Sequence, residues 1–185
     1  MQPFYAAFRA GDRDSANALV AGDPTLAIFS AALFGDVEEI EKLLAANRSL
    51  VNAVSPDGWF PLHLAAHFGH VDAARTLLNK GAPVNACSTN ASRNMPLHAA
   101  AAGRSLAVAK LLLDAGANSN AQQHGGWTPL HAVAQNGDVE FARVLVEGGA
   151  DVNARAENQQ RPLDLALTHG QQGMVDFLES HGASL

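Results

Sequence analysis

Apolar residues recur along this chain in a helical rhythm that stops and restarts at short intervals. Between positions 61 and 68 they lie three and four apart, as on one face of a helix, and the same spacing returns between 71 and 79. Gly69 follows the first stretch and Gly81 the second. Because glycine takes the left-handed conformation after a helix at the lowest cost, each should end a helix. The pattern predicts a pair of short helices.

The pair of helices recurs because the chain contains several copies of one segment. Four heptapeptides are near copies, and their prolines are separated by 35, 33 and 33 residues. Each proline fits the first turn of a helix, where no amide hydrogen bond is lost. Stretches rich in Asn, Gly and Pro join the copies and predict hairpin-like fingers. One copy cannot bury its apolar face alone, so the copies should stack into a solenoid. The heptapeptides are 60–66, 95–101, 128–134 and 161–167.

These copies resemble the ankyrin-repeat family, whose period is 33 residues and whose signature is Thr-Pro-Leu-His-x-Ala. The segment 128–134, Thr-Pro-Leu-His-Ala-Val-Ala, carries its first four residues, and the segments 60–66 and 95–101 carry Pro-Leu-His-x-Ala. The resemblance implies an all-α fold: an ankyrin-repeat solenoid of stacked helix-turn-helix units with short β-hairpin-like fingers. We expect one domain over 1–185. Its units would be an N-terminal cap, 1–24, and the repeats 25–58, 59–93, 94–126, 127–159 and 160–185.

Composition excludes several classes of protein. The chain has 185 residues, with 12 basic against 18 acidic ones and a formal charge of −6, which argues against a nucleic-acid surface or adhesion to anionic membranes. A lone Cys87 excludes an internal disulfide framework. Neither a secretory signal nor an apolar run of membrane-spanning length is present. We expect a cytoplasmic, monomeric protein, and the start at Met1 and the end after the last helix favour a complete small one.

The histidines suggest a metal site, but a structural role is favoured. His63, His67 and His70 have a spacing similar to that of metal ligands on a helix. The resemblance implies instead that the signature residues His63, His98 and His131 bond to neighbouring backbone, as buried polar groups normally do. His67 and His70 flank the glycine that ends the helix, so the three rings should not converge. We expect no metal and no cofactor.

Departures from the signature predict weaker junctions between finger and helix. Thr128 is the only signature threonine, since Phe60, Met95 and Arg161 replace it elsewhere, and Asp164 replaces the last histidine. Those repeats lose the usual Thr–His hydrogen bond, and drift within a redundant array is a sufficient explanation.

Two further irregularities lie in the repeats 59–93 and 94–126. Arg104 stands where the other units have the stopping glycine, so we expect a positive φ there or a reshaped turn. The finger 87–93 is two residues longer than the others. It is either a contact loop or an insertion that costs little. Cys87 at its start is expected to be a structural or idle thiol.

No nucleophile motif or phosphate-binding glycine loop is present, and repeats occupy the whole chain, so we expect no enzyme. The expected function is binding of a partner protein through the concave groove and fingertips. A small-molecule or metal-dependent activity in the groove, or a regulatory domain of a larger assembly, are the alternatives.

The resemblance implies that fingertips and first-helix ends touch the partner. Phe34, Trp59 and Phe68 would form an aromatic patch, although the two tryptophans could equally pack on adjacent fingers. Carried over by repeat position, the partner-binding residues are Leu33, Phe34, Asp57, Trp59, His67, Phe68, Trp127, Gln135 and Asn136, with Asn94, Ala102, Gln160, Thr168 and His169 at equivalent positions.

Overall fold

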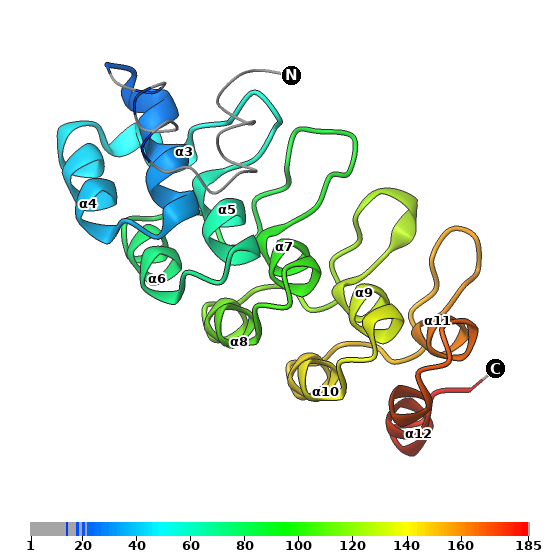
Figure 1. Ribbon diagram of the computed structural model, residues 1–185. Coiled ribbons are helices and arrows are strands. Elements are labelled where there is room, and N and C mark those ends of the chain that lie inside the picture. Colours follow the sequence, from blue (N-terminus) through cyan, green and yellow to red (C-terminus); the bar gives the residue numbers. More distant parts are fainter. Residues whose placement is uncertain (1–13, 15–17, 19, 21, 185) are drawn as a thin grey trace.

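A computed structural model describes residues 22–184 together with Asp14, Ala18 and Val20. The expected N-terminal cap, 1–24, therefore lies almost wholly outside the described residues. Within them, ten α-helices form five consecutive pairs (Figure 1). The pairs are α3 (Pro24–Phe34) with α4 (Val37–Ala46), α5 (Pro61–His67) with α6 (Val71–Asn79), α7 (Pro96–Ala102) with α8 (Leu106–Asp114), α9 (Pro129–Asn136) with α10 (Val139–Glu147), and α11 (Pro162–Thr168) with α12 (Gln172–Ser180).

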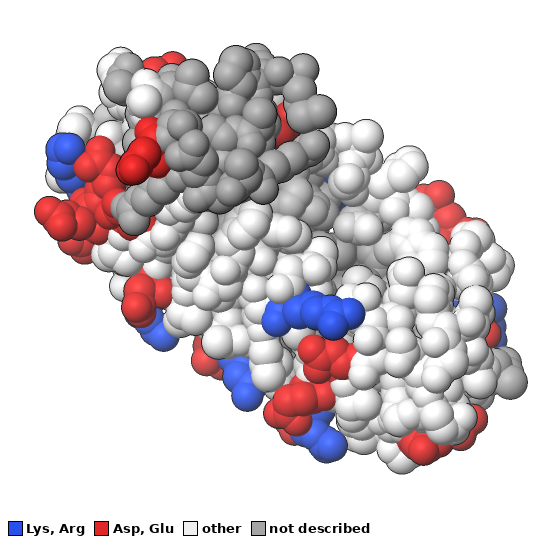
Figure 2. Space-filling view, viewed as in Figure 1, with Lys and Arg blue, Asp and Glu red and all other residues white. Residues whose placement is uncertain are grey.

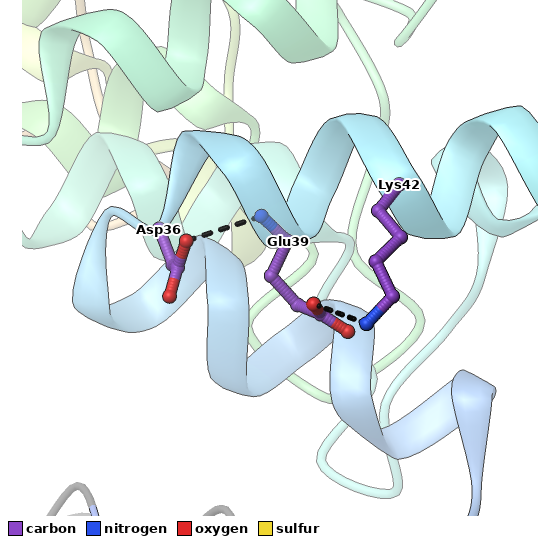
Figure 3. Close-up of polar contacts among 3 residues, drawn as sticks. All are labelled: Asp36, Glu39 and Lys42. Carbon is purple, nitrogen blue, oxygen red and sulfur yellow. Dashed lines mark hydrogen bonds and ion pairs between the residues drawn. The ribbon is translucent and has the colours of Figure 1, made fainter.

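Prolines and aspartates begin most of these helices. The four signature prolines each stand at the first turn of their helix, as the sequence predicted. Asp23 begins α3 by accepting hydrogen bonds from the amides of the next turn. Asp36 begins α4 in the same way, since its Oδ1 accepts from the amide of Glu39 at 3.1 Å (Figure 3). The Glu39 carboxylate then pairs with Lys42 at 2.9 Å, three residues on, and this exposed pair adds little stability.

Left-handed residues end the first helix of each pair. Gly35, Gly69, Gly137 and Gly170 all have positive φ, which confirms the predicted stops. Arg104 takes this position after α7 with φ 54°, also as predicted.

In this turn the glycine stands at position 103 and not at the left-handed position 104, for a separate reason. Gly103 has an ordinary φ of −81°, but a Cβ there would lie 1.9 Å from the backbone oxygen of His67 in the preceding repeat. Because α7 packs closely on the end of α5, only glycine fits at position 103. The left-handed residue that ends the helix is therefore Arg104.

Small residues let the inner helices stack closely. Ala65, Ala66, Ala100, Ala101 and Ala134 are at most 1 % exposed. They belong to one apolar core that continues from the first described residues to α12. Each inner helix packs on the next, from α3 through α5, α7 and α9 to α11, while the second helices form an outer row (Figure 1). This is the predicted all-α solenoid.

The fingers project on one side of the stack as hairpin-like loops without assigned strands in the described chain (Figure 1). A backbone hydrogen bond closes each, for example from the amide of Ser88 to the oxygen of Asn94 at 2.8 Å. Bonds also join neighbouring fingers. In the long finger 87–93, the amide of Thr89 donates to the oxygen of Gly58 at 2.9 Å, and Ser92 accepts from His124 at 2.9 Å. Short 3₁₀ turns lie at η1 (Arg48–Asn52) and η2 (His124–Gly126).

Candidate functional site

The signature histidines hold one repeat to the next. Nε2 of His63 lies 3.0 Å from the backbone oxygen of Asn94, and His98 and His131 make the same contact with Trp127 and Gln160, each at 3.1 Å. Burial lowers the pKa of His63 and of His98 to about 4 and lowers the pKa of His131. These rings are neutral near pH 7 and donate from Nε2, which confirms their predicted structural role.

The neighbouring histidines bond to different repeats. Nε2 of His70 lies 2.7 Å from the oxygen of Leu33 in the preceding repeat, whereas Nδ1 of His67 lies 3.3 Å from the oxygen of Ala99 in the following one. The rings of His63, His67 and His70 therefore do not form a common ligand set. Over the described residues, no three metal-binding side chains lie together.

The second ring nitrogen of each signature histidine depends on the residue three positions earlier. Thr128 satisfies Nδ1 of His131 with its hydroxyl at 2.8 Å and its amide at 3.1 Å. Only the Met95 amide serves His98, at 3.2 Å. His63, which follows Phe60, has a buried Nδ1 without a hydrogen-bond partner among the described residues.

In the last repeat, a different side chain holds the junction between finger and helix. There the Asp164 carboxylate accepts from the Arg161 amide at 2.8 Å. The predicted loss of the Thr–His hydrogen bond is thus correct for this repeat, but its cap is retained because a carboxylate can replace the imidazole as acceptor.

The expected contact surface is partly buried at its N-terminal end. Leu33 is only 5 % exposed, which corrects its assignment as a partner-binding residue. The cause is the composition of α3, which is apolar all round, with every residue from 28 to 33 buried. Phe34 is half-buried and packs against the core, and its contact with a partner stays a prediction.

Three aromatic rings of one repeat lie in contact. The ring centroids of Trp59 and His67 are 5.8 Å apart, edge to face, and those of His67 and Phe68 are 4.8 Å apart, also edge to face. Trp59 is half-buried, while Phe68 is 44 % exposed. The three residues form what we call the aromatic cluster, and Phe68 is its accessible member.

Trp127 also packs on its own repeat. Its ring lies 5.1 Å from that of His131, edge to face, and its side chain is half-buried. Of the other predicted contact residues, Asp57, Ala102, Gln135, Thr168 and His169 are exposed, and Asn136 and Gln160 are half-buried.

Asn94 departs from the expectation because it is only 8 % exposed. It lies beside a hollow of about 240 Å³ between the α7 and α9 repeats, which sequence reasoning did not find. Positions 59, 94, 127 and 160 are equivalent in successive repeats. The available signal for the hollow was that this series places the uncharged Asn94 between Trp59 and Trp127. The hollow is lined by Asn94, His98, Ala102, Gln123, Trp127, Thr128, Ala132 and Gln135.

Cys87 closes the long finger. Its thiol donates to the backbone oxygen of Arg93, at 3.3 Å, across the base of the loop. This contact agrees with the structural role expected from the sequence.

Comparison with known proteins identifies the family to which this chain belongs. A family model described as ankyrin repeats in three copies matches residues 28–123 and, in a second placement, residues 97–185. The chain belongs to the ankyrin-repeat family. The five helix pairs, the fingers and the histidine contacts are therefore those of an ankyrin-repeat array.

Curated relatives share stretches of this array. The chain is 42 % identical over 90 residues to the Neurogenic locus Notch protein of Drosophila melanogaster, which covers 48 % of this chain and 3 % of that protein. It is 36 % identical over 92 residues to Ankyrin repeat and SOCS box protein 3 of Homo sapiens, covering 49 % of this chain and 18 % of that protein. The ankyrin-repeat chain thus spans only a small part of the relatives it matches.

Ankyrin repeats generally mediate protein–protein contacts and are generally not catalytic. Among the described helices, none is long and apolar enough to cross a bilayer.

Proposed function

We propose that this ankyrin-repeat chain is a non-catalytic module that binds a partner protein through its concave groove and fingertips. The observation that carries the proposal is the aromatic cluster, in which Phe68 exposes 44 % of its surface at the end of an inner helix. Large exposed aromatic residues are enriched among the residues that dominate binding energy at protein interfaces. His67 packs edge to face on the Phe68 ring and Trp59 packs on His67 in turn, so a partner would meet a preorganised aromatic contact.

Charge is distributed in a way that suits an apolar contact. Figure 2 shows acidic and basic side chains mainly along the edge formed by the outer helices, whereas the middle of the visible face is largely uncharged apart from a basic group with acidic atoms beside it. The acidic residues Glu38, Glu39 and Glu41 of α4 belong to that outer row. We therefore expect binding to depend only weakly on salt concentration.

The remaining parts of the proposal are a monomeric state and a cytoplasmic location. A single thiol in an array stabilised by packing and backbone hydrogen bonds suits a reducing compartment. We propose Asp57, Trp127, Gln135 and Asn136 as surrounding contacts of the same surface.

The test is the variant Phe68→Ala, measured against a partner obtained by affinity purification from the native cells. Burying an exposed Phe against a partner contributes about 1.5–3 kcal/mol, so the dissociation constant should rise at least tenfold. Folding should survive because Phe68 lies at the surface.

Leu167→Ala is the matched control, since Leu167 is 47 % exposed but lies in the last repeat, away from the cluster. Its affinity should equal that of the unmodified chain. An unchanged affinity in Phe68→Ala would move the contact to the outer helices or the fingers.

A further inference from the structure

A hollow lies between the α7 and α9 repeats because small side chains replace large ones there. In the α5 repeat, the rings of Trp59 and His67 contact each other, with centroids 5.8 Å apart. The equivalent positions in the α7 repeat carry Asn94 and Ala102. Asn94 is only 8 % exposed, and Ala102 ends α7 with a single methyl group. This smaller pair leaves room in front of the α9 repeat, where the hollow measures about 240 Å³.

The accessible lining of the hollow is apolar and uncharged. The ring of Trp127 and the methyl groups of Ala102 and Ala132 line it, and none of the three residues is buried. No Asp, Glu, Lys or Arg belongs to the lining. A charged side chain that entered would therefore be removed from water without a counter-charge, which is costly.

The buried polar groups of the lining are not open to a ligand. His98 uses both ring nitrogens within the chain, on a backbone amide and on a backbone oxygen. The hydroxyl of Thr128 lies 2.8 Å from Nδ1 of His131, and Oδ1 of Asn94 is sealed from solvent. A polar side chain would lose its hydrogen bonds to water and find none of these groups to replace them, whereas an apolar side chain has none to lose.

Two glutamine side chains at the rim suit a peptide chain. The amide of Gln123 donates to the oxygen of Trp127 at 2.9 Å, so the two residues lie opposite each other at the base of the finger and share one face. Gln135, near the end of α9, is exposed. A carboxamide carries donors and an acceptor and can bond both the N–H and the oxygen of a peptide group. The residues equivalent to Gln123 in the other fingers are small and buried: Ser55, Ser88 and Ala156.

We propose that this hollow is a subsite for a large apolar side chain, that of a leucine, methionine or phenylalanine, on a segment of the partner protein. The side chain packs on Trp127, between the methyl groups of Ala102 and Ala132. The carboxamides of Gln123 and Gln135 bond the peptide groups of the same segment. The space suffices, since an apolar cavity of about 150 Å³ takes a benzene ring. The proposal rests on the proposed function, because it assumes a protein partner.

The subsite can be tested with blocked amino acids, which carry one side chain between two peptide groups. The probe N-acetyl-leucine methylamide is titrated into the ¹⁵N-labelled full chain and followed by NMR. We expect saturable shifts of the Trp127 indole, with a dissociation constant of about millimolar order for so small a ligand. The alanine compound should bind at least about fivefold more weakly, because it buries less apolar surface. The lysine compound should also bind more weakly, since its charge would be unpaired. Binding of either compound as tight as that of the leucine compound would overturn the proposal.

Two variants locate the binding by filling the hollow. Ala102→Leu fills it from the end of α7 and Ala132→Leu from α9, and circular dichroism checks that both fold. The fold should accept a leucine at 132 because the equivalent residues are Leu64 and Leu165. Each variant should abolish the shifts, whereas Ala46→Leu, at the exposed alanine that ends α4, should not. Undiminished binding to either folded variant would place the ligand elsewhere and overturn the proposal.

The double variant Gln123→Ala with Gln135→Ala tests the peptide contacts. It should raise the dissociation constant of N-acetyl-leucine methylamide at least about threefold and retain the preference for leucine over alanine. Gln122→Ala is the matched control, since Gln122 is an exposed neighbour outside the lining. An unchanged constant in the double variant would overturn the role of the two carboxamides.

A random dodecapeptide display library separates the subsite from the function on which it rests. Selected peptides that share a large apolar residue at one position and lose binding to Ala102→Leu would support the subsite. If all selected peptides still bind Ala102→Leu, protein binding is supported and the subsite is overturned. A failure to select any peptide, with N-acetyl-leucine methylamide still bound, would count against the proposed function and overturn a partner protein as the occupant.

Discussion

At the scale of single residues, the repeats differ in how completely they satisfy their signature histidine. His131 has partners for both ring nitrogens, because Thr128 supplies a hydroxyl at 2.8 Å. Among the described residues His63 has a partner for only one, since the side chain of Phe60 offers a ring stacked at 5.7 Å and no donor. A buried acceptor left unpaired costs about 1–3 kcal/mol. The repeat 59–93 therefore contains one unpaired buried acceptor, and a substitution that adds a hydrogen-bond donor should stabilise it.

Phe60→Thr should raise the free energy of unfolding by about 1 kcal/mol, because the new hydroxyl can donate to Nδ1 of His63. Urea denaturation followed by circular dichroism measures this change. Met95→Thr is the matched control, and its gain should be smaller, since the Met95 amide already donates to His98 at 3.2 Å. Equal gains in both variants, or a loss in Phe60→Thr, would contradict the assignment of the defect to Nδ1.

The buried histidines also make stability depend on pH. Their folded-state pKa of about 4, for His63 and His98, lies below the ordinary value of about 6.5 in the unfolded chain. Between these values the unfolded state binds protons and the folded state does not. Stability is thus fully present above pH 6.5, falls as the pH drops toward 4, and loses nothing more from these groups below that.

When the pH falls from 7 to 5, protonation of each of these two histidines in the unfolded state should lower the free energy of unfolding by about 2 kcal/mol. Denaturant unfolding at a series of pH values measures the total. In His98→Gln, which cannot titrate, the decrease should be smaller by that amount, whereas the exposed His124→Gln should retain the decrease of the unmodified chain. An identical pH dependence in His98→Gln would show that His98 does not contribute.

At the scale of elements, asparagine side chains join the turns of consecutive repeats. Nδ2 of Asn120 donates to the oxygen of Gly149 at 2.8 Å, and its Oδ1 accepts from the amide of Asp151 at 2.7 Å. Asn85 and Asn153 make equivalent pairs of bonds with the repeats that follow them. One side chain thus satisfies two backbone groups of the next repeat and fixes the stacking register.

Asn120→Ala should lower the free energy of unfolding by about 1–2 kcal/mol, because two backbone groups of the next turn lose their partner. Chemical denaturation monitored by tryptophan fluorescence is the measurement. Asn52→Ala is the control, since Asn52 lies on η1 and makes no such bridge within the described residues. Its effect should stay within about 0.5 kcal/mol. Similar losses at both sites would show that the bridge itself contributes nothing.

At the scale of the whole molecule, the array is nearly one-dimensional, and a unit's stability depends on its neighbours. The described structure places no repeat beyond α11 and α12. Leu167 is accordingly 47 % exposed at a position where Ala66, Ala101 and Ala134 are buried. The last unit is held from one side, where the Asn153 side chain bonds to Gly182 and Ser184.

Hydrogen exchange should therefore show residues 160–184 opening before residues 59–134, which have a repeat on each side. The measurement is native-state exchange followed by mass spectrometry of peptic fragments. Leu167→Gln should leave this order unchanged, because the side chain already faces solvent. Uniform protection along the whole array would contradict the prediction.

Much of the fold could be predicted from the sequence because ankyrin repeats are specified locally. The repeat period predicted that the units stack, the prolines predicted where helices begin, and the glycines predicted where helices end. Even the exception was predictable, since Arg104 has the positive φ that its place in the repeat required. The structural role of the three signature histidines followed from the family resemblance. Proline geometry, left-handed glycine and helical periodicity act within a few residues, so a linear pattern records them.

Burial and pairing were decided only by the tertiary structure. Leu33, Phe34 and Asn94 stand at positions expected to face the groove, yet the first is buried, the second packs on the core and the third is an enclosed amide. The glycine at position 103 is explained by a carbonyl 36 residues away, that of His67. Exposure depends on which side chains of other repeats come within contact distance, and periodicity gives only the direction in which a side chain points.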